Sequence, residues 1–203
     1  MEKIQTKLIN FIIFLSISLN LNSYESNTSE IIVDISEQRL YLLEKDIIIE
    51  SFPISSSKYG EGSIVNSFKT PLGRHIIKEK IGSNVALNSI FVARINTEIK
   101  AEIISTLDDS EDDYVTSRIL WLDGQEDGIN RGEGVDSYSR YIYIHGTHEE
   151  GLIGKKASHG CIRMFNEDVI KLYDMVYKGT NVYIKAWDCF NLKIISYWRH
   201  LKS

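Results

Sequence analysis

Residues 158–163 read Ser-His-Gly-Cys-Ile-Arg, and residues 141–147, a short spacer upstream, read Tyr-Ile-Tyr-Ile-His-Gly-Thr. The two stretches place one cysteine, two histidines and two glycines in a short part of the chain. A free cysteine thiol has a pKa of about 8.5, so a nearby imidazole is needed to produce the nucleophilic thiolate at neutral pH. The pattern therefore predicts a thiol acyl-transfer site at Cys161.

The two histidines, His145 and His159, are the candidate bases for this thiol. Residues 141–144 are β-branched or aromatic, which predicts a strand that holds His145 rigidly at its end. His159 is close to Cys161 in sequence, but closeness in sequence does not set geometry. Gly146 and Gly160 allow sharp turns and leave backbone amides free to point inward, as an oxyanion hole requires.

Two other interpretations compete with catalysis. An isolated cysteine is most often a small buried hydrophobic residue, and an isolated histidine a hydrogen-bonded core residue. A Cys/His cluster can also bind zinc, but Cys189 lies far downstream and no C-x-x-C or H-x-x-x-H spacing surrounds it. We therefore expect catalysis, with no metal and no cofactor.

The histidine segment, the spacer and the cysteine segment together resemble the signature of the YkuD-type L,D-transpeptidases of bacterial cell walls. Upstream, residues 31–42 resemble the opening hairpin of that family, and residues 69–73, Lys-Thr-Pro-Leu-Gly, resemble a turn that follows its second strand pair. The resemblance extends from residue 30 to residue 186. It implies a mainly β fold with one or two helices, an L,D-transpeptidase-type β-sandwich or barrel in which the catalytic cysteine loop precedes a helix.

The resemblance also implies roles for the site residues. Cys161 matches the nucleophile, and His145 matches the general base, oriented in that family by the backbone carbonyl of the next residue, here Gly146. The backbone amides of Gly160 and Cys161 are the expected oxyanion donors. His159 is expected to shape the site.

The same resemblance implies an enzyme that acts on peptidoglycan stem peptides and is acylated by carbapenems. Transfer of the acyl group to a second stem would form a 3–3 cross-link, whereas transfer to water would make an L,D-carboxypeptidase. A non-catalytic wall-binding module and a cysteine peptidase or amidase of other specificity are the alternatives. The residues expected to contact substrate are Arg163, Ser158, Thr147 and Tyr143; Arg163 would either pair with a stem-peptide carboxylate or brace the loop.

Length and composition suit one catalytic domain. The chain has 203 residues, of which 43% are hydrophobic and 25% charged, as in ordinary globular proteins. A net charge of -5 argues against nucleic acid as a partner, because a phosphate backbone would be repelled. We expect a monomer whose catalytic domain spans residues 30–187, followed by a C-terminal extension at 188–203.

The N-terminus is typical of an export signal. Lys3 and Lys7 precede a mostly apolar run at residues 8–21, which is short for a membrane span. The alternatives for residues 1–23 are a cleaved signal peptide, an uncleaved membrane anchor or a buried first helix. We expect export to the periplasm or cell envelope, with the thiols of Cys161 and Cys189 both free because a disulfide would inactivate the nucleophile.

Three local predictions concern the rest of the chain. One helix should be capped by Asn166 and end at Gly179. Strands are expected at residues 31–35, 39–43, 47–54, 74–79, 90–95, 119–122, 141–144 and 182–185. The acidic stretch at residues 108–113 is expected to be a solvated surface loop, with a cation or an ammonium group of the substrate as the alternative ligand.

Overall fold

The computed structural model describes residues 29–186. The predicted export signal, the C-terminal extension and Cys189 lie outside this range. Within it, no helix is both long enough and apolar enough to cross a membrane. The described part of the chain contains one α-helix and one 3-10 turn among its strands, which confirms the predicted mainly β fold.

The strands occupy most of the segments that the sequence predicts, and the elements follow one another in the order β1 (Ser29–Asp34), β2 (Arg39–Glu44), β3 (Ile47–Pro53), β4 (Gly73–Ile81), β5 (Ser89–Val92), β6 (Ile95–Lys100), β7 (Val115–Gly124), β8 (Tyr143–Gly146), η1 (Glu150–Leu152), β9 (Ile162–Met164), α2 (Asn166–Met175) and β10 (Asn181–Lys185). The helix follows the cysteine segment directly, as expected.

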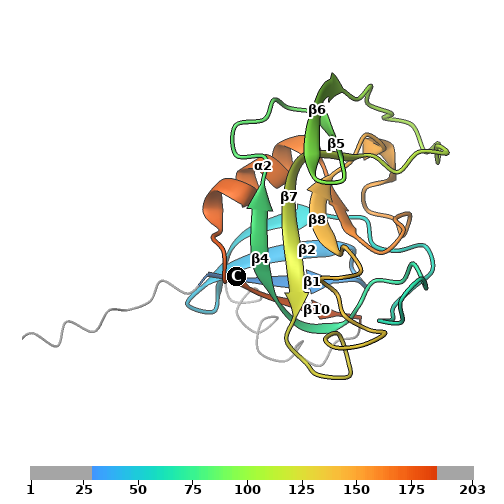
Figure 1. Ribbon diagram of the computed structural model, residues 1–203. Helices are drawn as coiled ribbons and strands as arrows, with labels where there is room; N and C mark the ends of the chain where they lie inside the picture. The colour runs from blue at the N-terminus through green and yellow to red at the C-terminus, as the bar shows by residue number, and fades with distance from the viewer. Residues whose placement is uncertain (1–28, 187–203) are drawn as a thin grey trace, which may run out of the picture.

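All strands belong to one sheet, in the order β3-β2-β1-β10-β4-β7-β5-β6, with β8 on β7 and β9 on β8. The sheet folds over, so that β1 and β2 cross behind β4 and β7, while α2 lies beside the upper ends of β4 and β7 (Figure 1). Ser55, just after β3, exchanges two backbone hydrogen bonds of 2.9 Å with Arg163 in β9. This contact joins the β3 end of the sheet to the β8–β9 branch, next to the cysteine loop.

An apolar core packs β1 and β2 against β7, β8 and the helix. Its fully buried members include Ile31 in β1, Leu42 in β2, Leu120 in β7, Ile144 in β8 and Leu172 in α2. Burying an aliphatic side chain stabilises the fold by about 1.5–3 kcal/mol relative to leaving it exposed. Because β8 and β9 contribute to the same core as β1 and β2, packing in this core fixes their position against those two strands.

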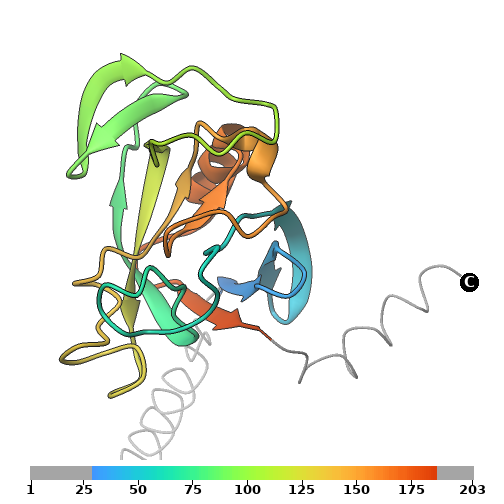
Figure 2. The same cartoon turned by 90° about the vertical axis from the view of Figure 1, so that its right-hand side faces the viewer.

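The predicted strand at residues 90–95 is wrong, because two strands meet there in a hairpin. Ala93 and Arg94 form its turn with φ angles of 48° and 69°, and Phe91 pairs with Asn96. Residues with positive φ at both central positions of a two-residue turn match the twist of a hairpin. The hairpin projects from the body of the molecule beside β7 (Figure 2).

The predicted ends of the helix are also wrong. Phe165 is the N-cap and makes no side-chain cap hydrogen bond, whereas Asn166 is the first helical residue. At the other end the helix stops at Met175, and Gly179 belongs to the turn before β10. The ammonium group of Lys80 on β4 donates to carbonyl oxygens of the last turn, at 2.6 and 2.5 Å, which suits the negative end of the helix dipole.

Asn166 points into the protein rather than capping the helix, and its buried amide joins four segments. Its Nδ2 donates to the carbonyl oxygen of Thr147 at 2.7 Å and to Glu150 at 2.8 Å. Its Oδ1 accepts from the hydroxyls of Thr116 and Ser117, both at 2.6 Å. A buried amide with all these partners ties β7, the end of β8 and η1 to the start of the helix.

We predict that Asn166→Ala lowers the free energy of unfolding by about 2–4 kcal/mol, because each buried polar partner left unpaired costs about 1–3 kcal/mol. The measurement is a urea titration followed by fluorescence. Asn181→Ala is the matched control, since Asn181 is exposed on β10. Equal midpoints for the two variants would show that the network adds no stability.

Candidate active site

The register of two short strands brings the predicted site residues together. In the parallel pair formed by β8 and β9, Ile144 lies opposite Ile162 and His145 opposite Arg163. Alternate side chains point to opposite faces of a strand. Both isoleucines enter the core, so His145 and Arg163 share the other face with Tyr143, next to the loop that ends at Cys161.

The hydrogen bonding of His145 fixes its tautomer. The ring is 1% exposed, and its Nδ1 lies 2.7 Å from the carbonyl oxygen of Gly146. A carbonyl oxygen only accepts, so Nδ1 carries the proton and the lone pair is on Nε2. Burial lowers the pKa of His145 despite the opposing influence of Asp113, so the imidazole is neutral and able to accept a proton at neutral pH.

Gly146 is a strand residue, not the sharp turn predicted. A Cβ at this position would lie 2.5 Å from Oδ1 of Asn166 and 2.8 Å from the carbonyl oxygen of Thr116. Glycine is needed here because only a residue without a side chain lets β8 approach the Asn166 network. The carbonyl that orients His145 is therefore itself fixed by close packing.

Cys161 is a free thiol with two backbone partners. Its Sγ accepts a hydrogen bond from the amide of Tyr143 at 3.3 Å and donates to the carbonyl of Tyr141 at 3.4 Å. Burial raises the pKa of Cys161 to about 12, against the opposing effect of the Tyr143 amide. The resting site thus holds a neutral thiol and a neutral imidazole, and the proton must move during the attack on a carbonyl.

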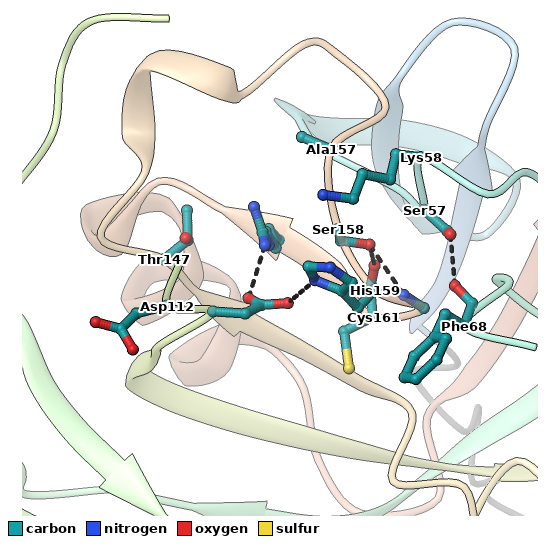
Figure 3. Close-up of polar contacts among 12 residues, drawn as sticks. Ser57, Lys58, Phe68, Asp112, Thr147, Ala157, Ser158, His159 and Cys161 are labelled. Carbon is teal, nitrogen blue, oxygen red and sulfur yellow. Dashed lines mark hydrogen bonds and ion pairs between the residues drawn. The ribbon is translucent and has the colours of Figure 1, made fainter. Parts of the chain in front are cut away.

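The loop before Cys161 is braced by Ser158, whose hydroxyl donates to the Cys161 carbonyl at 2.6 Å and accepts from the Gly160 amide at 3.3 Å. Figure 3 shows Ser158, His159 and Cys161 close together on this loop, with the Ser158 hydroxyl directed to the backbone. Thr70 donates to the Gly160 carbonyl at 3.0 Å, and Gly160 has a φ of 121° that favours glycine. Because Ser158 already engages the Gly160 amide, the Cys161 amide is the better placed of the two predicted oxyanion donors.

His159 lies at the edge of the site rather than in it. Its Nδ1 contacts the carboxylate of Asp113 at 2.8 Å, and its ring lies 5.8 Å from the ring of Tyr59 and 6.1 Å from that of Phe68. Both aromatic rings are about half exposed. This arrangement fits the predicted shaping role, because the imidazole is held between a carboxylate and an aromatic rim.

Arg163 is engaged by two carboxylates within the protein. The side chain is 1% exposed, with NH1 2.6 Å from Glu149 and NH2 2.7 Å from Asp113. Glu149 is itself buried and also accepts from the Ser110 amide at 2.5 Å. Of the two roles predicted for Arg163, this geometry favours bracing the loop over binding a substrate carboxylate.

The two other residues expected to contact substrate are also largely buried. Thr147 is fully buried, and its hydroxyl accepts from the amide of Glu149 at 3.1 Å. Tyr143 is 7% exposed, its amide points to Cys161, and its hydroxyl accepts from Arg94 at 3.4 Å. Contact between their side chains and a substrate stays a prediction. The structure shows both residues packed in the interior and hydrogen-bonded to neighbouring segments.

Asp113 is the functional residue that the sequence did not single out. It closes the acidic stretch and starts the approach to β7, and its carboxylate joins His159 to Arg163. Burial alone would raise the pKa of Asp113. This effect is outweighed by the charges of Arg163 and His145 and by the hydrogen bonds from Arg163 and His159, which hold the pKa below its usual value. Residues 108–113 form an exposed loop, as expected, and the side chain of Asp113 is 29% exposed, but its carboxylate also engages two residues of the candidate site.

A family model described as the YkuD L,D-transpeptidase catalytic domain matches residues 28–184. Two Bacillus subtilis (strain 168) proteins assigned to the L,D-transpeptidases are similar over shorter segments: YkuD is 56% identical over 49 residues, 24% of this chain and 30% of the relative, and YqjB is 49% identical over 45 residues, 22% and 26%. The matched segments thus span less than a third of either relative.

Solved L,D-transpeptidase structures also align with this chain. One from Mycobacterium smegmatis has a TM-score of 0.48 at 18% identity and covers 78% of this chain and 58% of its own. L,D-transpeptidase 3 from Mycobacterium tuberculosis, in complex with a faropenem-derived adduct, has a TM-score of 0.48 at 16% identity, with coverages of 78% and 60%.

The pKa of the thiol leads to a prediction for alkylation by iodoacetamide in a Cys189→Ser background. Because burial raises the pKa of Cys161, the rate should rise roughly tenfold per pH unit from pH 7 to 10 without a plateau. The same protein unfolded in urea should level off above its ordinary pKa of about 8.5. A rate independent of pH below 7 would instead reveal a preformed thiolate–imidazolium pair.

The position of Asp113 leads to a prediction for His145. The carboxylate favours the imidazolium form, so Asp113→Asn should lower the pKa of His145 further, as followed by NMR titration of the ring protons. Asp112→Asn is the matched control, because the hydrogen bond described for its carboxylate is to the Tyr114 hydroxyl, at 2.8 Å, and the side chain points away from His159 (Figure 3). Equal titration curves for the two variants would exclude Asp113 as a support for the base.

Proposed function

The chain belongs to the YkuD family of L,D-transpeptidase catalytic domains, a family of enzymes, and on that premise we propose that it cross-links peptidoglycan stem peptides through a thioester on Cys161. The observation that carries the proposal is the shared face of β8 and β9. There the Tyr143 amide holds the sulfur, and the carbonyl of Gly146 leaves Nε2 of His145 free as a base.

In the proposed first step the sulfur of Cys161 attacks the carbonyl carbon between the third and fourth residues of a stem peptide. The S–C bond forms, the thiol proton passes to Nε2 of His145, and the negative charge develops on the carbonyl oxygen next to the Cys161 amide. Collapse breaks the C–N bond. His145 then returns the proton to the leaving amine, which departs with the terminal D-amino acid.

In the second step the neutral side-chain amine of a second stem attacks the thioester, so that a C–N bond forms and the C–S bond breaks. His145 accepts the proton of the amine and passes it to the departing sulfur, which re-forms the thiol and releases the 3–3 cross-link. The negative charge on Asp113 supports both steps, because it favours the imidazolium that exists while His145 holds a proton. Arg163 and Glu149 hold that carboxylate in place from the buried side.

The decisive test is incubation of the pure protein with a disaccharide tetrapeptide, with product masses read by mass spectrometry. We expect a cross-linked dimer that has lost one D-amino acid, and no product from Cys161→Ala. His145→Ala should be slower by about 10²–10⁴-fold, the usual cost of removing a positioned base. A tripeptide without dimer would identify an L,D-carboxypeptidase, and an unchanged substrate would identify a non-catalytic module.

A carbapenem gives a second readout of the same nucleophile. Its strained amide should be opened by Cys161, since the S–C bond forms as the ring C–N bond breaks and no atom leaves. The protein mass should therefore rise by one inhibitor, located on Cys161 by peptide mapping. Modification of Cys189 in its place would contradict the proposed activation.

We propose that the enzyme acts outside the cytoplasm, because its proposed substrate is the assembled wall and residues 1–21 have the composition of an export signal. Residues 1–30 fused to a reporter that is active only after export should give signal. Leu15→Asp, which places a charge in the apolar run, is the control and should abolish the signal. A stable but silent wild-type fusion would argue for a cytoplasmic enzyme.

A further inference from the structure

Two arginines act electrostatically on the Cys161 thiol, and they differ in their partners. Arg163 is buried between Glu149 and Asp113, so its charge is compensated within the protein. Arg140 is half-buried and donates only to backbone carbonyls among the contacts that the structure describes for residues 29–186: to Lys69 at 2.7 Å and to Gly62 at 3.4 Å. A guanidinium without a carboxylate partner next to a nucleophile is a candidate anion site.

Hydrogen bonds and close contacts place Arg140 beside the thiol. It directly precedes Tyr141, whose carbonyl oxygen lies 3.4 Å from Sγ of Cys161. Its NH2 holds the Lys69 carbonyl oxygen, which lies 3.5 Å from the point that a Cβ of Gly160 would occupy. The carbonyl oxygen of Lys69 thus contacts both the guanidinium of Arg140 and the cysteine loop at Gly160.

The charge of Arg140 is maintained in this setting. Burial lowers the pKa of Arg140, and the interaction with Cys161 opposes that effect, but an arginine remains protonated throughout the physiological range. Each guanidinium has five N–H donors in a planar fork, and the two backbone carbonyls leave donors unused. Those donors suit the two oxygens of a carboxylate.

We propose that Arg140 binds the terminal carboxylate of the D-amino acid that follows the scissile bond. This inference rests on the proposed function and adds its substrate selectivity. In a stem peptide that ends one residue beyond the attacked carbonyl, the carboxylate lies within about one Cα–Cα step, 3.8 Å, of the reacting bond. An anchor for that carboxylate selects tetrapeptide stems over stems that continue past this residue.

The test uses binding rather than turnover, so that it does not depend on catalysis. Calorimetry in a Cys161→Ala background compares a disaccharide tetrapeptide that has a C-terminal carboxylate with the same molecule as a C-terminal amide. We expect the acid to bind about 10- to 100-fold more tightly, the usual effect of a charged hydrogen-bonded contact. Adding Arg140→Gln should abolish this preference, and Arg140→Lys should retain part of it.

Arg131→Gln is the matched control, because it removes the same charge from an exposed side chain whose only described ion pair is with Asp127, at 3.8 Å. It should leave the acid preference intact. The proposal is overturned if Arg140→Gln weakens the binding of the acid and of the amide equally, since that would indicate a purely structural role. It is also overturned if the acid preference is lost instead in Arg94→Gln, which changes the arginine that donates to the Tyr143 hydroxyl. Absence of any acid preference overturns it as well. Loss of turnover with a retained acid preference would instead overturn the proposed function alone.

Discussion

The parallel pairing of β8 with β9 is the constraint on which the active site depends. A shift of β9 by one residue in that register would send Arg163 into the core and Ile162 toward the site, and a shift of β8 would do the same to His145 and Ile144. Burial of the two isoleucines prevents such a shift, because exposing them would forfeit the free energy of core packing. The apolar core thereby sets the geometry of the polar site on the opposite face of these strands.

The ionisable side chains beside the site form a connected series whose exposure to solvent increases along the series. Glu149 and Arg163 are both 1% exposed, and Asp113 lies above them and reaches the more accessible His159. A buried ion pair is not by itself a strong source of stability, since desolvation offsets much of the Coulomb attraction. Its effect here is positional: it fixes a carboxylate where it can favour protonated His145.

The neutral resting state and the uncompensated arginine fit one physical picture. A thiol whose pKa is raised by burial stays protonated at neutral pH, and in the proposed mechanism it becomes nucleophilic when a base accepts its proton. The proposed role of Arg140 as an anion site fits its surroundings, because within residues 29–186 the contacts described for its guanidinium are with neutral backbone carbonyls. The substrate would then bring the charge that completes the site.

The sequence by itself determined the strand that carries His145, most strand positions and a helix after the cysteine, and it predicted the segment of the proposed nucleophile, because these depend on local periodicity and on residue chemistry. It did not reveal that Ala93 and Arg94 form a turn, that Asn166 points inward, or that Asp113 belongs to the site. Those outcomes depend on partners far away in the chain: His159 and Asp113 are 46 positions apart, and Asn166 meets Thr116 across 50. The partner of a charged or polar side chain is chosen by burial and by which distant segments converge, and only the tertiary structure decides that.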